Sequence, residues 1–258
     1  MTIILLALAA LQGTPVDAPS CAAMVRASPE QAIAAADAWR LRGGGLEARN
    51  CLGLAYAAAE RWAPAAAAFE QAAREAEGRR EGRSADFWAQ SGNAWLAAGN
   101  AAAAVKAFDA ALATSALQAE LRGEVHLDRA RAQVALGGSA AARADLDRGL
   151  SLVPADPFGW YLSAALARRD NDLARAQKDI AKAIELAPHE PRLLLEGGNI
   201  AGLSGDLAAA RALHARAAKA DPEGEAGRAA AAALLANTAA EAEAPAAPAA
   251  PKPAPQSR

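Results

Sequence analysis

The sequence has 258 residues, of which 53% are apolar but only 4% are aromatic, and its formal net charge is -2. A chain so close to neutrality lacks the basic surplus of nucleic-acid-binding proteins, so we expect no nucleic-acid partner. Its apolar residues are largely alanine and leucine, which are strong helix formers, and the composition therefore predicts an all-α core.

The first part of the chain predicts export. An apolar run from Ile3 to Leu11 is followed by helix-breaking residues at 13–15. This order is typical of a secretory signal peptide, so we interpret residues 1–18 as one and expect a periplasmic or otherwise exported protein. The run is too short to span a bilayer, and no integral membrane span is expected. If the segment is not cleaved, it is instead an N-terminal apolar helix of a cytoplasmic protein.

Residues 19–45 predict an N-terminal helix or a degenerate repeat unit. Ser28, Pro29 and Glu30 form a helix start, because serine caps a helix, proline suits its first turn and an acidic residue favours its positive end. We expect this helix to end at the glycines 43–45.

The chain has two cysteines, Cys21 and Cys51, and they leave two interpretations open. In an oxidising compartment, a disulfide between them would close a loop of about 30 residues and stabilise the fold by about 3–4 kcal/mol. Otherwise both residues are buried thiols that behave as small apolar side chains.

The following part of the chain is repetitive. Pro154, Pro188 and Pro222 stand 34 residues apart, each at position 32 of a 34-residue unit. Positions 8, 20 and 27 of these units hold only alanine or glycine, namely Ala130, Ala164, Gly198, Ala142, Ala176, Ala210, Gly149, Ala183 and Ala217. Position 15 holds Gly137, Asn171 and Gly205, which are residue types that end one helix and turn into the next. Small residues let helices approach closely, so the pattern predicts helix–turn–helix units that stack on one another.

Two further units lie upstream with longer joints. Their motifs are Leu-Gly-x-x-Tyr at 52–56, Trp-x-x-Ser-Gly-x-x-Trp at 88–95, and Ala-x-x-x-Phe at 65–69 and 104–108. With these motifs the chain resembles the tetratricopeptide repeat family over residues 46–222, and its exported bacterial members in particular. The resemblance implies an all-α, right-handed superhelical solenoid of antiparallel helix pairs.

Five repeat units are expected, at 46–79, 85–118, 123–156, 157–190 and 191–224. Residues 225–238 predict a C-terminal helix that caps the last repeat. Residues 239–258 are rich in alanine, glutamate and proline, a composition that predicts a disordered tail.

The family resemblance also implies where a partner binds. In tetratricopeptide arrays the first helix of each unit lines a concave groove, whose positions correspond here to Asn93, Arg131, Phe158, Tyr161, Arg168, Arg169, Arg192 and Asn199. Arginines beside aromatic residues predict a groove for an acidic or C-terminal peptide with an apolar anchor. Alternatively, Arg168 and Arg169 are a solvated helix end. The family's dicarboxylate clamp needs a lysine where this chain has Ala89, so no clamp is expected.

No catalytic or metal-binding motif is found in the sequence. His126, His189 and His214 fall at unrelated repeat positions, and no group of His, Cys, Asp and Glu has metal-ligand spacing. We therefore expect no enzyme activity, no catalytic residue, no metal and no cofactor.

These features predict a non-catalytic scaffold that binds a protein or peptide in its groove, in the bacterial cell envelope. Two alternatives stay open. One is a self-associating structural module that forms a homo-oligomer, and the other is a cytoplasmic adaptor with an uncleaved N-terminus.

Overall fold

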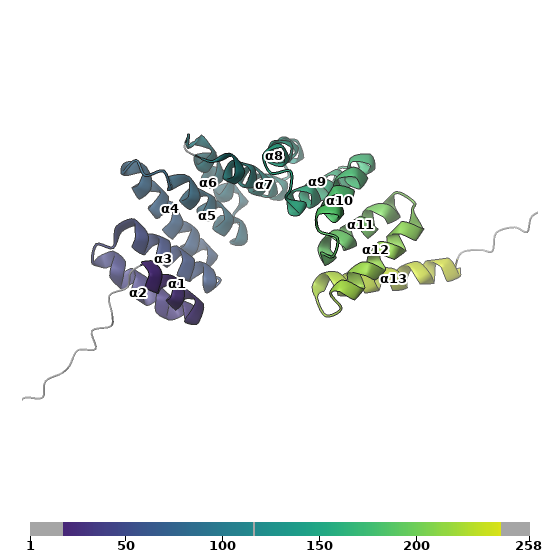
Figure 1. Ribbon diagram of the computed structural model, residues 1–258, viewed down its shortest axis with the longest axis horizontal. Helices are drawn as coiled ribbons and strands as arrows, with labels where there is room; N and C mark the ends of the chain where they lie inside the picture. Colours follow the sequence, from purple (N-terminus) through teal and green to yellow (C-terminus); the bar gives the residue numbers. More distant parts are fainter. Residues whose placement is uncertain (1–17, 116, 244–258) are drawn as a thin grey trace, which may run out of the picture. The chain divides into compact units, whose positions relative to one another are not determined.

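A computed structural model describes residues 18–115 and 117–243 (Figure 1). The expected signal peptide, apart from Ala18, and the tail beyond Glu243 lie outside the described residues. The described chain forms thirteen α-helices and, within those ranges, no strand, which confirms the predicted all-α fold. The described residues divide into two compact units at the boundary between Pro154 and Ala155, which we call unit 1 and unit 2.

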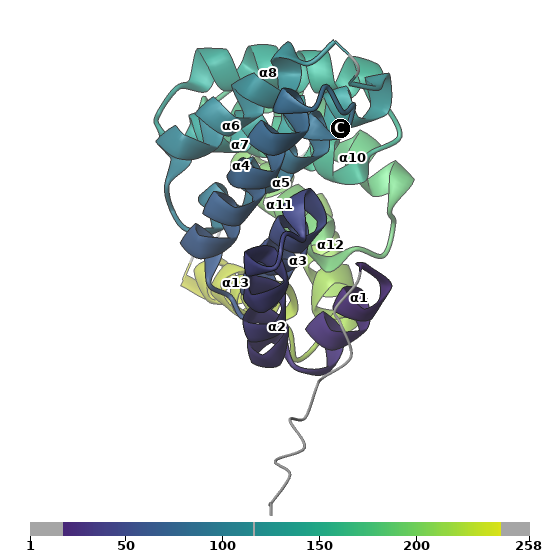
Figure 2. The same cartoon turned by 90° about the vertical axis from the view of Figure 1, so that its left-hand side faces the viewer.

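Unit 1 contains eight of the described helices. They are α1 (Ala18–Ala27), α2 (Pro29–Leu41), α3 (Gly45–Ala58), α4 (Trp62–Gly78), α5 (Ser84–Ala97), α6 (Ala101–Ala113), α7 (Ala119–Ala135) and α8 (Ser139–Leu152). Each packs against the next along the chain, and α1 also contacts α3 (Figure 2). Ser28 precedes α2 as expected, but its side chain makes no capping hydrogen bond. The longer joints correspond to the 17-residue helices α4 and α7.

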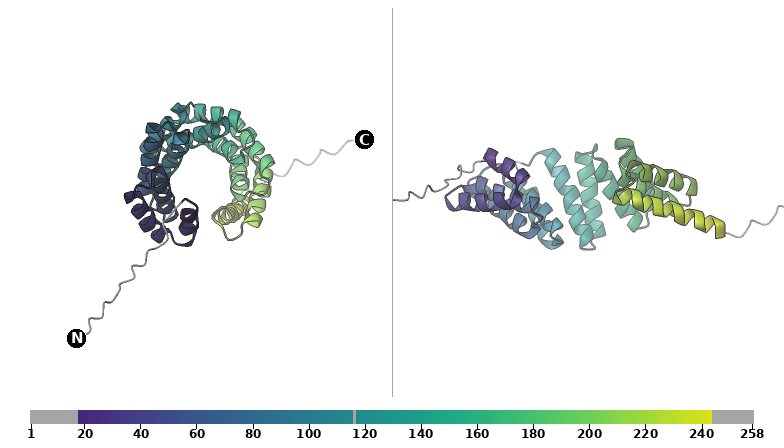
Figure 3. Two further views of the ribbon diagram at one scale, coloured as in Figure 1. Left: turned by 60° about the vertical axis from the view of Figure 1, so that its left-hand side comes forward. Right: turned by 90° about the horizontal axis from the view of Figure 1, so that it is seen from below.

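Unit 2 contains the other five described helices. They are α9 (Pro157–Arg169), α10 (Leu173–Leu186), α11 (Pro191–Leu203), α12 (Leu207–Ala220) and α13 (Glu225–Glu243). Helix α13 packs on α11 and α12, as Figures 1 and 3 show. It continues beyond residue 238, where a helix end was expected, because residues 239–243 are alanine and glutamate and the first proline follows at 245.

The turn inside each helix pair has the same backbone conformation. The residue at position 15 has a positive φ in all five pairs: 56° at Glu60, 75° at Gly99, 80° at Gly137, 61° at Asn171 and 85° at Gly205. Glycine and asparagine tolerate this left-handed conformation, so these residue types were a valid sequence signal for the turn. Glu60 is the exception, and its side chain makes this conformation cost roughly 1–2 kcal/mol.

Positions 8 and 24 of each helix pair are complementary in size. In chain order they hold Gly53 and Phe69, Gly92 and Phe108, Ala130 and Leu146, Ala164 and Ile180, and Gly198 and His214. All ten residues are buried, as are the other small residues at positions 20 and 27. A Cβ atom added to Gly92 would lie 2.5 Å from Cε1 of Phe108. Glycine at position 8 therefore provides the space that a ring at position 24 occupies.

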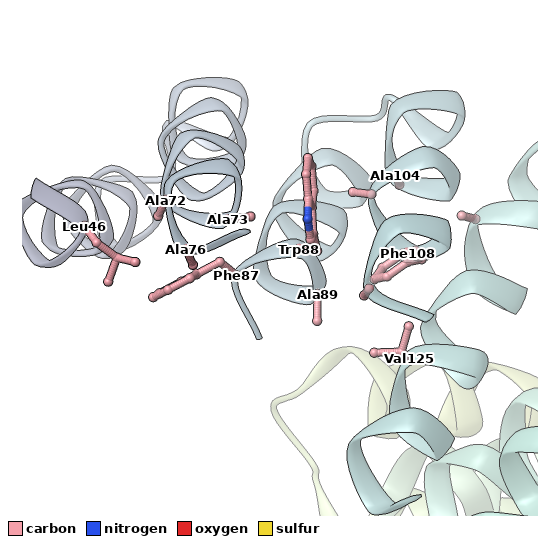
Figure 4. Packing of buried hydrophobic residues seen from close by; sticks show 13 residues of the cluster. Leu46, Ala72, Ala73, Ala76, Phe87, Trp88, Ala89, Ala104, Phe108 and Val125 are labelled. Atoms are coloured by element: carbon pink, nitrogen blue, oxygen red, sulfur yellow. The ribbon is translucent and has the colours of Figure 1, made fainter. Parts of the chain in front are cut away.

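The apolar core runs between successive helices rather than around one centre. In unit 1, a cluster that includes Phe87, Trp88 and Phe108 fills the space beside the alanines of α4 and α6 (Figure 4). Trp88 Nε1 donates a hydrogen bond to Glu77 Oε1 at 2.6 Å, so its polar atom is satisfied. In unit 2, Ile180 and Ile200 belong to the corresponding cluster.

A disulfide bond attaches α1 to the first helix pair. It joins Cys21 to Cys51, whose Cα atoms are 5.9 Å apart. Both residues are buried, and Met24, Ile33 and Trp39 pack against the same cluster. The bond therefore holds α1 on α3, with a sequence separation of 30 residues between the cysteines.

One ionic cluster is buried in unit 1. Asp145 of α8 is 1% exposed, and its carboxylate accepts hydrogen bonds from Arg129 Nε at 2.8 Å and from His126 Nδ1 at 2.8 Å. Arg129 also donates to Asp109 at 2.6 Å, so the cluster connects α6, α7 and α8. Burial raises the pKa of the Asp145 carboxyl, but the bonds from His126 and Arg129 outweigh burial and lower it from 3.8 to about 2.

We predict that Gly92→Ala destabilises the protein by roughly 1–2 kcal/mol, because overpacking against the Phe108 ring exceeds the helix propensity that alanine gains. The measurement is urea unfolding followed by circular dichroism. Gly202→Ala is the matched control: its added Cβ meets only Ala210 Cβ, at 3.8 Å, so alanine there should stabilise by up to about 1 kcal/mol. Equal effects of the two substitutions would contradict the size rule.

We predict that Asp145 stabilises the fold in a pH-dependent way. Because folding lowers the pKa of this carboxyl, its contribution is present above pH 4 and is lost as the pH falls toward 2. The pKa difference corresponds to about 2 kcal/mol. Unfolding free energies of the wild type and Asp145→Asn should differ most near neutral pH, and the difference should shrink by about that amount in acid. A difference independent of pH would refute the prediction.

Candidate functional site

The residues expected in the groove lie on the first helices of the pairs, α5 and α7 in unit 1 and α9 and α11 in unit 2. Pockets open on these helices in both units. One, which we call the Asn93 pocket, is lined by Asn93, Leu96, Ala97, Asp128 and Arg131. The other, which we call the Tyr161 pocket, is lined by Tyr161, Glu190, Pro191, Arg192, Leu195, Glu196, Asp221, Glu225, Ala226 and Ala229. Each pocket is described within its own unit.

The Asn93 pocket brings two of the expected residues together through a carboxylate. Asn93 Nδ2 of α5 donates to Asp128 Oδ2 at 2.9 Å, and Arg131 Nη1 donates to Asp128 Oδ1 at 2.9 Å. Asp128 was not among the expected residues. Because it satisfies both neighbours, this pocket of about 550 Å³ presents a hydrogen-bonded polar surface rather than a free positive charge.

The Tyr161 pocket lies between three helices of unit 2. Tyr161 comes from α9, Arg192, Leu195 and Glu196 come from α11, and Glu225 comes from the first turn of α13. Its volume is about 520 Å³, within the range of about 300–1,000 Å³ typical of ligand sites. Ala226 and Ala229 of α13 contribute small apolar side chains to its lining.

The arginines that line or border the Tyr161 pocket form ion pairs with glutamates. Arg168 Nε donates to Glu196 Oε1 at 2.6 Å, and Arg192 Nε donates to Glu190 Oε1 at 3.0 Å. Burial and the Glu196 carboxylate raise the pKa of Tyr161 above its ordinary 10.0, against a smaller opposite effect of the arginines. The Tyr161 hydroxyl therefore stays protonated and can donate a hydrogen bond.

The other expected residues lie outside the lining of the Tyr161 pocket. Phe158 is 38% exposed, and the Arg192 guanidinium stands over its ring, 4.8 Å from the centroid. Asn199 Oδ1 accepts a hydrogen bond from His214 Nε2 at 3.2 Å and so belongs to the packing of α11 on α12. Arg169 lies exposed at the end of α9.

The structure adds carboxylate partners to three of the arginines expected in the groove. Arg131, Arg168 and Arg192 each pair with a carboxylate of the same unit. The sequence reasoning counted the arginines and omitted their partners, because Asp128 and Glu196 stand at position 6, which was not considered. The positive charge of these three arginines is therefore compensated within the protein.

The sequence reasoning also missed the contribution of α13. The unit length was the signal that could have found it, since one more step of 34 residues from Pro191 gives Glu225 as the start of a sixth first helix. On that count Ala226 stands at position 2, like Arg192, and Ala229 stands at position 5, like Tyr161. Both line the Tyr161 pocket.

The candidates for catalysis and metal binding are not assembled into a site. His126 belongs to the buried Asp145 cluster and His214 is buried against Gly198, and neither lines one of the two named pockets. Across residues 18–115 and 117–243, no group of three or more His, Cys, Asp or Glu could hold a metal ion. No helix in the described ranges is long and apolar enough to cross a membrane.

Comparison of the sequence with known proteins gives a partial match. No protein-family model matches the sequence. A segment is 35% identical over 89 residues to the probable biofilm formation methyltransferase WspC of Pseudomonas putida, which covers 34% of this chain and 21% of that protein. The chain thus spans about a fifth of the length of this curated relative.

Comparison of the structure gives likenesses over most of the chain. PilW, a type IV pilus biogenesis factor, matches with a TM-score of 0.68 at 21% identity, covering 82% of this chain and 94% of PilW. PilF of Pseudomonas aeruginosa matches with a TM-score of 0.66 at 16% identity, covering 84% and 95%. YrrB, a TPR protein with an unusual peptide-binding site, matches with a TM-score of 0.55 at 15% identity, covering 77% and 96%. The chain therefore has the tetratricopeptide repeat fold that its sequence motifs predicted.

Proposed function

We propose that this protein is a non-catalytic scaffold that binds a segment of a partner protein, with the Tyr161 pocket as its main binding site. The observation that carries the proposal is the pocket itself, because three first-helix segments of unit 2 converge on it. A half-buried tyrosine, an aliphatic side chain and charged groups around one cavity are suited to holding a peptide side chain. YrrB, a TPR protein described with a peptide-binding site, offers a precedent for this use of the fold.

The match to a methyltransferase does not favour catalysis by this chain. It covers 21% of that protein, so about four fifths of the methyltransferase has no counterpart in the match. A shared segment of this size is compatible with a repeat module in both proteins.

We further propose that the protein works in the cell envelope. Disulfides persist in oxidising compartments such as the periplasm, and the Cys21–Cys51 bond is buried in the fold. The likeness to PilW, a pilus biogenesis factor, supports the same location. N-terminal sequencing and fractionation in the native host test it, and an uncleaved cytoplasmic protein would refute it.

We predict that filling the pocket weakens partner capture. Ala229→Trp places a large ring at an exposed position of the pocket lining. Ala231→Trp places the same ring at an exposed position of α13 outside the lining and serves as the control. Partners are recovered by crosslinking in the native cell and identified by mass spectrometry. The wild type and Ala231→Trp should recover the same proteins in similar amounts. Ala229→Trp should recover about tenfold less of them, which corresponds to a loss of about 1.4 kcal/mol of binding free energy. Equal recovery with both variants would refute the pocket as the binding site.

We predict that the disulfide is present in the exported protein and stabilises it by about 3–4 kcal/mol, because it closes a loop of some 30 residues. Intact mass and thiol labelling should detect no free thiol until a reductant is added. The reduced protein should then unfold at lower urea concentration by the corresponding amount, and Cys21→Ser should behave like it. Two labelled thiols in the native protein would contradict this prediction.

A further inference from the structure

We propose that the Tyr161 pocket receives a lysine or arginine side chain from an extended segment of the partner. This inference rests on the proposed function and adds the charge of the segment that is bound. It reverses the preference for an acidic peptide that the arginine positions alone predicted.

The balance of charge around the pocket is the first argument. Four carboxylates line it, those of Glu190, Glu196, Asp221 and Glu225. Arg192 neutralises Glu190, and Arg168 neutralises Glu196. Asp221 and Glu225 make no ion pair within the part of the chain that the structure describes. The pocket thus keeps two carboxylates without a cation.

The position of Arg192 is the second argument. Its guanidinium is held over the Phe158 ring while its Nε donates to Glu190. An arginine engaged on both sides is not available to neutralise Asp221 or Glu225, which stand at the α12–α13 end of the pocket. An incoming cation would therefore meet the unpaired carboxylates without displacing an existing pair.

The apolar part of the lining is the third argument. Leu195, Ala226 and the ring of Tyr161 lie in the same cavity as the carboxylates. Lysine and arginine have an aliphatic stem below a charged head, so they match a pocket whose lining has both apolar and acidic side chains. An aspartate or glutamate has a shorter aliphatic stem and would be repelled by Asp221 and Glu225.

A random peptide library selected on the full chain tests the inference. We expect selected peptides to be enriched in lysine or arginine at one shared position, and a lysine-to-glutamine change there to weaken binding about tenfold. Because the attraction is electrostatic, binding should also weaken as salt rises. Enrichment of acidic residues, or of no charge, would overturn the inference and leave the proposed function standing. Failure to select any peptide would count against both.

Variants that remove the carboxylate charges test whether Asp221 and Glu225 cause the preference for a basic residue. Asp221→Asn with Glu225→Gln should remove the preference for the basic residue, whereas Glu223→Gln, an exposed acidic residue outside the lining, should keep it. An unchanged preference in the double variant would place the cation elsewhere and overturn the inference. Lys252 is the lysine within residues 244–258 of the same chain. If peptides were selected only on the Lys252→Gln variant, the chain's own lysine would be the ligand of the pocket, and the assignment to a partner would be overturned.

Discussion

The spacing between the two helices of a pair depends on the sum of two side-chain volumes. The space between the two helices can be filled in two ways. Glycine lies opposite a ring, as Gly92 does with Phe108, or alanine lies opposite an aliphatic side chain, as Ala130 does with Leu146. Because protein interiors are close-packed, neither partner can grow alone without moving a helix. Positions 8 and 24 therefore determine how closely the second helix of a pair packs on the first, and the first helices carry most of the pocket residues.

The fold was accessible from the sequence because its determinants are local and recur. The turn residues Gly137, Asn171 and Gly205 report a backbone conformation that few residue types adopt, and the small residues report close contact between helices. Helix α1 and the full length of α13 were less accessible. Alanine-rich segments form helices wherever no proline intervenes, so composition fixes their type better than their ends.

The site was only partly accessible, for a physical reason. The expected list contained Tyr161, Arg192 and Asn93, which line pockets. It also contained Asn199, which instead bonds to His214. The net charge of a site depends on which side chains from different helices lie close together. Aligning equivalent repeat positions does not show which carboxylate pairs with which guanidinium. Asp145 and Asp221 illustrate the difference, since the first is neutralised inside the fold and the second lines a cavity.

Helix α13 has two roles that are usually separate in a stacked array. A terminal helix normally only protects the last apolar surface from water, but here Ala226 and Glu225 also form one wall of the Tyr161 pocket. Adding or removing a repeat at this end would therefore change the lining of the Tyr161 pocket at the same time as the number of helices. Under the proposed function, the number of repeats at the C-terminal end of unit 2 is limited by the pocket that the last helix helps to form.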